Sequence, residues 1–192
     1  MSLVELIARA DERGLAASGL ACLDRCVPLL GGDDEVLRPL WASLADGGED
    51  DGDDWSGRLE KARGALDGTG ADGTAEDEAA RLARHMLATA PSARTAAEVR
   101  AWADACSIAS LRIHRLLDPA EPAEDTVPVD SCREGGAEDV SPLVAAEVRR
   151  QIAVLELLAG HGPAGVRQAL EVSTEGRRVL RAVVSRRARG RG

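Results

Sequence analysis

The sequence predicts an all-α protein, an irregular bundle of about eight amphipathic helices with acidic loops and a proline-containing linker. Ala and Leu, which head the helix-propensity ranking, account for 34 and 23 of the 192 residues. Phe and Tyr are absent and only three Trp occur, so aromatic residues that favour strands are scarce. This composition argues against a β-sandwich, a large parallel sheet and a binding cleft lined by aromatic rings.

Six helices are predicted in an N-terminal region, residues 1–118. Ser2 with Glu5, and Thr95 with Glu98, have the spacing of a capping box at a helix start. Gly14 should end the first helix, and Pro28 should bend or stop the second. The predicted helices span 2–13, 15–30, a segment after Asp33 and Asp34 that becomes regular near Arg38, 55–66, 74–90 and 95–117.

Residues 119–140 form a predicted linker with three prolines and seven acidic residues against Arg133 alone. We expect disorder over much of 119–138, because long segments without hydrophobic periodicity are functional loops or disordered. Two more helices, 141–159 and 164–187, should form a C-terminal hairpin within 141–192 that packs on 1–118 as one domain. In the first of these helices the apolar spacing places Val148 and Ile152 centrally in the core.

Asp50, Asp51 and Asp54 match the DDxxD pattern with which prenyl-diphosphate enzymes hold magnesium. Such carboxylates must face an apolar cavity from a helix, whereas these lie in a glycine-broken acidic loop. An EF-hand is excluded, because a calcium loop built around Gly52 would begin at Gly47 and end at Arg58. Because both metal-site patterns fail, a solvated acidic loop is the preferred interpretation of the segment around Asp50–Asp54. No phosphate-binding glycine motif occurs in the chain either.

Cys22 and Cys26 lie one helical turn apart, as two metal ligands on a helix would. Both, like Cys106, fall on apolar stripes, where cysteine behaves as a small hydrophobe; a metal site or a redox pair is the alternative. The three histidines, His85, His114 and His161, belong to no recognisable catalytic motif. We therefore predict no catalytic residue, no cofactor and no metal, unless these histidines converge in a pocket.

Charge is distributed unevenly along the chain, which has a net charge of −9. Residues 33–78 contain 15 acidic and four basic residues, whereas 177–192 contain seven arginines and no acid. The basic segment could complement the helix dipole, pack on acidic loops of its own or a neighbouring chain, or bind nucleic acid. The acidic chain and the lack of interleaved aromatics argue against nucleic acid. The candidate interaction residues are Arg177, Arg178, Arg181, Arg186, Arg187, Arg189, Arg191, Asp50, Asp51, Asp53 and Asp54.

Targeting signals are not evident, since the N-terminus lacks a secretory pattern and no apolar run could span a membrane. We expect a cytoplasmic protein with reduced thiols. The single Lys beside 23 Arg indicates the codon usage of a high-GC bacterial genome. The leading hypothesis is a non-enzymatic protein–protein interaction module, with a second copy among its candidate partners. The alternatives are a small-molecule- or metal-dependent enzyme with a cleft between helices, and a DNA-associated regulator that uses the Arg-rich C-terminus.

Overall fold

The computed structural model describes residues 1–45, 52–66, 75–118, 128–136 and 140–190. All regular structure within these ranges is helical, which confirms the all-α prediction. The helices are α1 (Leu3–Arg9), α2 (Glu12–Cys26), α3 (Arg38–Ala45), α4 (Gly52–Leu66), α5 (Ala75–Ala88), α6 (Ala96–Leu117), α7 (Val129–Glu134), α8 (Pro142–His161) and α9 (Pro163–Arg189), with a 3-10 turn, η1, at Val27–Leu29.

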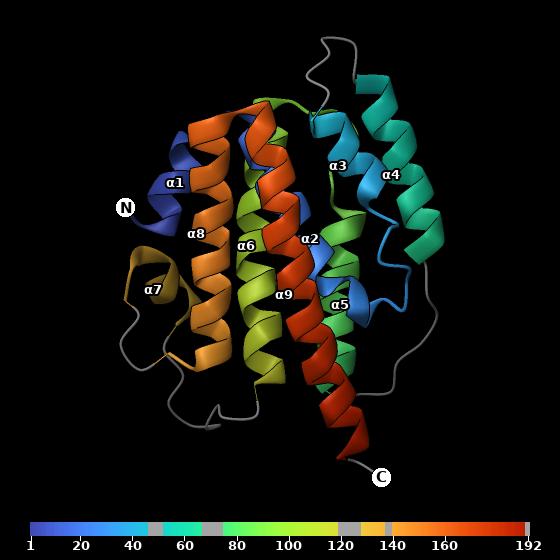
Figure 1. Ribbon diagram of the computed structural model, residues 1–192, viewed down its shortest axis with the longest axis vertical. Helices are drawn as coiled ribbons and strands as arrows, with labels where there is room; N and C mark the ends of the chain where they lie inside the picture. Colours follow the sequence, from blue (N-terminus) through green and yellow to red (C-terminus); the bar gives the residue numbers. More distant parts are fainter. Residues whose placement is uncertain (46–51, 67–74, 119–127, 137–139, 191–192) are drawn as a thin grey trace.

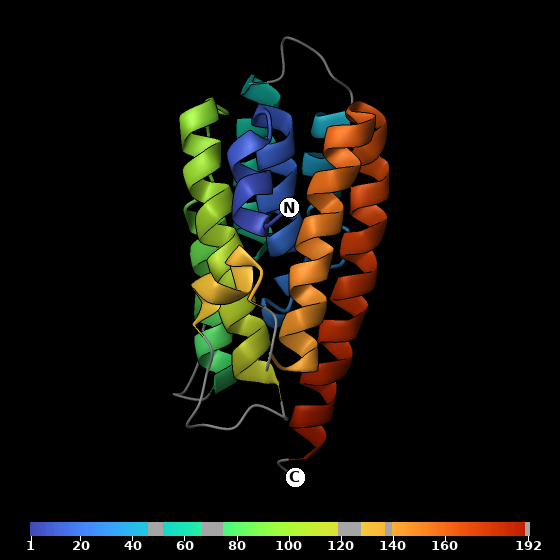
Figure 2. The same ribbon diagram turned by 90° about the vertical axis from the view of Figure 1, so that its left-hand side faces the viewer.

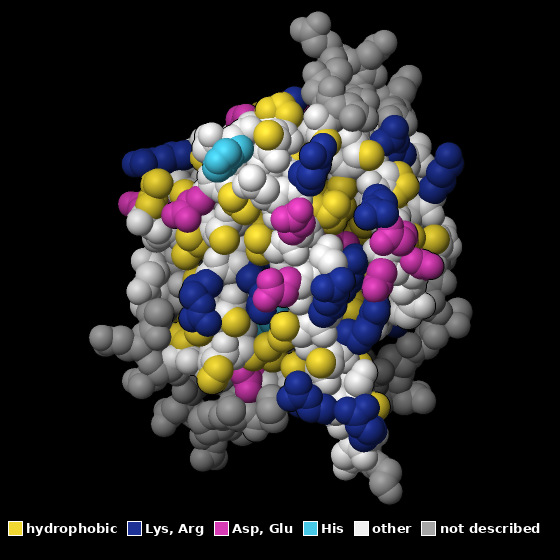
Figure 3. Space-filling model, viewed as in Figure 1, with side chains coloured by type: hydrophobic (Ala, Val, Ile, Leu, Met, Phe, Trp, Pro, Cys, Tyr) yellow, Lys and Arg dark blue, Asp and Glu magenta, His cyan; other side chains and the backbone are white. Residues whose placement is uncertain are grey.

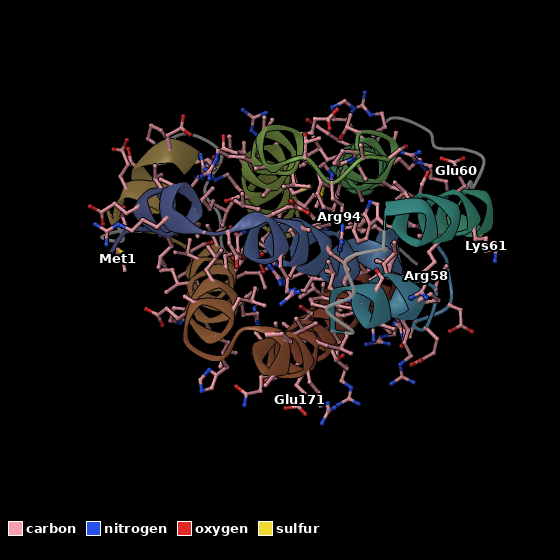
Figure 4. All side chains as sticks on the ribbon, turned by 90° about the horizontal axis from the view of Figure 1, so that it is seen from above. Met1, Arg58, Glu60, Lys61, Arg94 and Glu171 are labelled. Atoms are coloured by element: carbon pink, nitrogen blue, oxygen red, sulfur yellow. The ribbon has the colours of Figure 1, made fainter. Side chains whose placement is uncertain are left out.

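The helices are arranged in three layers, with α2 in the middle (Figure 1; Figure 4). α5 and α6 cover one side of α2, α8 and α9 cover the other, and α3 and α4 close one flank. Every residue of α2 from Gly14 to Cys26 is buried. A helix enclosed in this way places its polar residues in the interior as well, so Asp24 and Arg25 need partners from the surrounding helices.

Close packing between α2 and α6 depends on Gly19. A Cβ atom at this position would lie 2.6 Å from Cζ3 of Trp102, so only glycine lets the indole ring lie against the α2 backbone. Trp102 also donates a hydrogen bond from Nε1 to the Met86 carbonyl (2.8 Å) and meets Trp55 edge to face at 6.4 Å. Two of the three tryptophans therefore join α4, α5 and α6 to the core.

Capping residues set several helix ends as predicted. Ser2 and Glu5 form a complete capping box, and α6 begins after Thr95 and ends at Leu117. The predicted start of the second helix is wrong, because Asp11 caps α2 by accepting a hydrogen bond from the Gly14 amide (2.7 Å). Gly14 thus lies in the first turn of α2 instead of ending the helix before it.

The prediction of disorder is wrong for residues 128–136, which contain α7. Cys132 and Arg133 are buried there, and Arg133 donates a hydrogen bond to Ser107 and pairs with Asp104 on α6. A charged side chain with partners inside the bundle holds this short helix in place, which a hydrophobic pattern cannot reveal. The rest of the predicted disorder, 119–127 and 137–138, lies outside the described residues.

The predicted centre of the α8 core face is wrong. Val148 and Ile152, expected centrally in the core, are only partly buried. The face of α8 that points into the bundle is rotated toward two polar residues and consists of Val144, Glu147, Gln151, Val154, Leu155 and Leu158. The rotation is possible because Glu147 and Gln151 find hydrogen-bond partners on α2 and α6.

Candidate functional site

A fully buried polar network centred on Glu147 joins α8 to α2 and α6. Arg25 donates hydrogen bonds to the Glu147 carboxylate from Nε (2.9 Å) and from its terminal nitrogen (2.6 Å), and both side chains are 0% exposed. The Ser110 hydroxyl (2.8 Å) and the Gln151 amide (2.9 Å) donate to the same carboxylate. Burial by itself would raise the pKa of Glu147, but Arg25 and His114 outweigh it and hold this pKa at about 2. Glu147 is therefore ionised in the core.

His114 belongs to this network and not to a pocket. Its Nδ1 lies 2.7 Å from the Ser110 carbonyl, and its Nε2 lies 3.4 Å from the Glu147 carboxylate. Burial lowers the pKa of His114, although Glu147 opposes the shift. His85 and His161 are exposed on α5 and at the end of α8, so the structure does not bring the three histidines together.

The cysteines lie in the core, as expected for small hydrophobes. Cys22, Cys26 and Cys106 are buried and reduced, and burial raises the pKa of each thiol, to about 12 for Cys22. A thiol must lose its proton to bind a metal, so this environment disfavours metal ligation. Among the described residues, His, Cys, Asp and Glu form no group of three or more that could hold a metal ion.

A second set of charged residues fastens α9 to α2 and to the turn before α3. Arg177 pairs with the Asp24 carboxylate (2.7 Å) and donates a hydrogen bond to the Asp34 carbonyl (2.7 Å). Arg181 donates hydrogen bonds from two nitrogens to the Asp34 carboxylate. Gly176, just before Arg177, makes room for the Arg25 side chain of the Glu147 network, since a Cβ there would lie 2.4 Å from Cδ of Arg25. Arg177 and Arg181, two of the predicted interaction residues, thus pair with carboxylates of their own chain.

The Arg177–Asp24 pair lies at the floor of a groove of about 630 Å³ between α3 and α9. Its rim carries exposed charges of both signs, which meet over this region in Figure 3, and Glu171 projects outward from α9 in Figure 4. Its floor includes buried Asp24, whose pKa burial raises to about 6 against the opposing effect of Arg177. The full lining is Asp24, Asp34, Glu35, Arg38, Trp41, Arg167, Leu170, Glu171, Thr174, Glu175, Arg177 and Arg178.

Three polar atoms at the floor of the groove have no hydrogen-bond partner among the described residues. They are Oδ2 of Asp24, Nε1 of Trp41 and Nε of Arg177; the last lies 3.7 Å from Asp34, too far for a hydrogen bond. These residues are 1%, 2% and 5% exposed. The other two tryptophans, in contrast, donate their indole N–H groups to backbone carbonyls at 2.8 Å. Such atoms also occur elsewhere in the described residues, but three of them belong to residues that line this one groove.

Two smaller cavities lie elsewhere in the described part of the chain. One of about 380 Å³ lies between α1 and the end of α8, and one of about 460 Å³ lies between α4 and α5. Neither these cavities nor the groove between α3 and α9 is lined by a histidine or a cysteine. None of the three therefore contains a nucleophile beside a histidine base.

The opposite end of α9 is strongly basic. The last turn of α9 carries Arg186, Arg187 and Arg189, and α9 projects past its neighbours at this end (Figure 1; Figure 2). Arg187 donates a hydrogen bond to the Leu117 carbonyl (3.3 Å), which brings the C-terminal end of α6 alongside. We call the resulting surface the basic end; it consists of Arg112, Arg115, Arg186, Arg187 and Arg189.

Within the described part of the chain, no carboxylate lies within ion-pair distance of Arg112, Arg186 or Arg189. All three side chains are exposed, and Lys and Arg side chains gather over the lower end of α9 in Figure 3. The sequence pattern indicated the contribution of α9. It did not indicate the contribution of α6, because nothing in the sequence places Leu117 beside Arg187.

The remaining predicted interaction residues do not join the basic end. Arg178 lines the rim of the groove, while Arg191, Asp50 and Asp51 lie outside the described residues. Asp53 and Asp54 belong to the first turn of α4, at the end of the molecule opposite the C-terminal end of α9 (Figure 1). Asp24, Arg25 and Glu147 were not predicted from the sequence, although the charges within the apolar run 20–27 are a visible signal of polar partners in the core.

No helix within the described ranges combines the length and the apolar character needed to cross a membrane. Comparison of the chain with protein-family models, with curated proteins and with solved structures gives no match. The surfaces of the molecule itself, above all the groove and the basic end, are therefore the basis on which its function is inferred.

Proposed function

We propose that this protein is a non-enzymatic protein-binding module that docks an acidic protein surface on its basic end. The observation that carries the proposal is the Arg187 hydrogen bond to the Leu117 carbonyl, which brings the C-terminal ends of two arginine-bearing helices, α6 and α9, together. Arg112, Arg186 and Arg189 on these helices are exposed and have no carboxylate partner among the described residues. Exposed charges of one sign at neighbouring helix ends attract a surface of opposite charge, and salt screens this attraction over a Debye length of about 8 Å.

Helix-dipole compensation explains only part of this surface. Cations in the last turn of a helix are stabilised by the helix C-terminus, which accounts for Arg186, Arg187 and Arg189. The effect fades within one turn, and Arg112 lies more than one turn before the end of α6 at Leu117. Arg112 therefore adds positive charge that the stability of α6 does not require, which favours a binding role.

Protein is a better partner for this surface than nucleic acid. The basic end contains no aromatic side chain on which a base could stack, and the chain as a whole carries a net charge of −9. A DNA duplex has one negative charge per roughly 1.7 Å, so a net acidic protein meets repulsion along most of its length. A short acidic protein segment can contact the basic end alone.

A binding experiment with a matched control tests the proposal. The probe is a short fluorescein-labelled peptide of alternating Glu and Ser, and binding is followed by fluorescence anisotropy at low and at physiological salt. The variant Arg112→Gln/Arg186→Gln/Arg189→Gln should bind roughly tenfold more weakly, because three exposed ion pairs contribute about 0.5 kcal/mol each. The control Lys61→Gln/Arg81→Gln/Arg149→Gln removes the same charge from other exposed positions and should bind like the unmodified protein.

Two results would overturn the proposal. Equal weakening in both triple variants would show that the peptide responds to net charge and not to the basic end. Tighter binding of a short DNA duplex than of the peptide, lost in the first variant, would instead support the DNA-associated alternative.

A further inference from the structure

The groove between α3 and α9 lies away from the basic end and rests on different observations. We propose that this groove binds a neutral carboxamide, the group carried by Gln and Asn side chains and by small primary amides. Three buried atoms of its lining residues, one hydrogen-bond acceptor, Oδ2 of Asp24, and two donors, Nε1 of Trp41 and Nε of Arg177, have no hydrogen-bond partner among the described residues.

A carboxamide complements these three atoms. Its NH2 group donates and its carbonyl oxygen accepts through two lone pairs, so one ligand group can serve both kinds of atom. The amide nitrogen pairs with Asp24, and the carbonyl accepts from Trp41 or Arg177. A hydroxyl group can also donate and accept, but it does both through a single oxygen atom. A carboxamide donates from its nitrogen and accepts at its oxygen, so it can reach two different partners at once.

Charge balance at the floor selects a neutral ligand. Asp24 is paired with Arg177, and Asp34 with Arg181, so the carboxylates and guanidinium groups already match one for one. A ligand carboxylate would lie near Asp24 and face repulsion, and a ligand ammonium would have no acceptor to offer Trp41. Either ion would also lose its hydration beside an already balanced pair, which is costly in a partly buried site.

The floor is reached by moving side chains that are weakly held. Arg38 precedes Trp41 by three residues on α3, so the two side chains are neighbours on one face of the helix. The Arg38 side chain is 68% exposed and pairs with Glu35, which is 57% exposed, and such surface pairs contribute little. Arg38 and Trp41 both line the groove, which has the size of a small-ligand site, so we expect displacement of Arg38 to open a path to Trp41.

The indole N–H signals of the three tryptophans give a direct test by ¹H–¹⁵N NMR. Trp55 and Trp102 are internal references because their indole groups are bonded to backbone carbonyls. The probes are propionamide and, as size-matched controls, propionate and propylammonium. Propionamide should shift the Trp41 signal progressively, with the millimolar or weaker affinity expected of so few atoms, while the two reference signals stay in place. The variant Trp41→Phe assigns the signal.

Two variants sharpen the test. Asp24→Asn exchanges the acceptor for a donor with little change in shape, and it should weaken propionamide binding about tenfold. Arg38→Ala should bind propionamide at least as well as the unmodified protein, because it uncovers the floor. The proposal is wrong if propionamide leaves the Trp41 signal unmoved, as it would if water alone occupies the floor, or if the charged probes shift it equally. A folded Asp24→Asn variant with unchanged binding would also overturn it; if that variant does not fold, the three probes on the unmodified protein decide.

Discussion

Replacing Glu147 by Leu should remove the only carboxylate that pairs with Arg25 among the described residues. Both side chains are 0% exposed, and three hydrogen bonds between 2.6 and 3.2 Å join them. Breaking a buried ion pair on one side costs about 3–5 kcal/mol, because the surviving charge keeps its desolvation penalty. For a chain of this length, that loss corresponds to a decrease in Tm of roughly 6–20 °C.

The double variant Arg25→Met/Glu147→Leu is the informative control. It removes both charges, so it should recover at least about 2 kcal/mol relative to the sum of the two single changes, a coupling that adjacent partners commonly show. Full recovery is not expected, since Ser110 and Gln151 lose their acceptor. Urea unfolding at neutral pH, followed by far-ultraviolet circular dichroism, measures the free energies. A Glu147→Leu variant within 1 kcal/mol of the unmodified protein, or losses that simply add, would refute the argument.

Three further predictions follow from buried groups. Burial raises the pKa of Asp24 to about 6, above its unfolded value, so the folded state holds this proton more tightly. The contribution of Asp24 to the free energy of unfolding should therefore fall by about 2 kcal/mol as pH rises from about 4 to 6, and Asp24→Asn should abolish that step in pH-dependent urea unfolding. Gly19→Ala should lower the free energy of unfolding by about 1–3 kcal/mol in thermal melting, because its Cβ would overlap the Trp102 ring. Its control, Gly57→Ala, meets open space on α4 and should raise the free energy of unfolding by about 0.5–1 kcal/mol. A disulfide reagent should modify neither Cys22 nor Cys26 before the protein unfolds, and metal analysis should find zinc well below one equivalent. Rapid labelling or stoichiometric zinc would show that these thiols are accessible or bind metal.

Local sequence signals predicted most helix positions. The capping residues Ser2 and Thr95 mark true helix starts, and in α6 Val99, Cys106 and Ile113 are buried on one face. Such signals depend on residues three or four positions apart, whose contacts the chain itself guarantees. They failed on α8, where Val148 and Ile152 formed a plausible stripe but the core face contains Glu147 instead.

The candidate site could be predicted only in part for the same reason. The seven arginines of 177–192 were visible in the sequence, but their division was not: Arg177 and Arg181 pair with Asp24 and Asp34, whereas Arg186 and Arg189 remain exposed at the basic end. These pairs join residues that are 147 and 153 positions apart. Hydrophobic periodicity carries no information about which distant charge a charge will meet, and the floor of the groove likewise depends on contacts between α2, α3 and α9.

The central place of α2 has a consequence for the order in which the protein matures during synthesis. Arg25 and Asp24 find their partners 122 and 153 residues further along the chain. A ribosome that adds about 5–20 residues per second needs roughly 6–30 s to supply these partners. During that interval the nascent α2 presents an apolar surface interrupted by charges that have no counter-charge. The helix at the centre of the native bundle is therefore among the first segments translated and among the last to be completed, so chaperone capture of arrested nascent chains should centre on it.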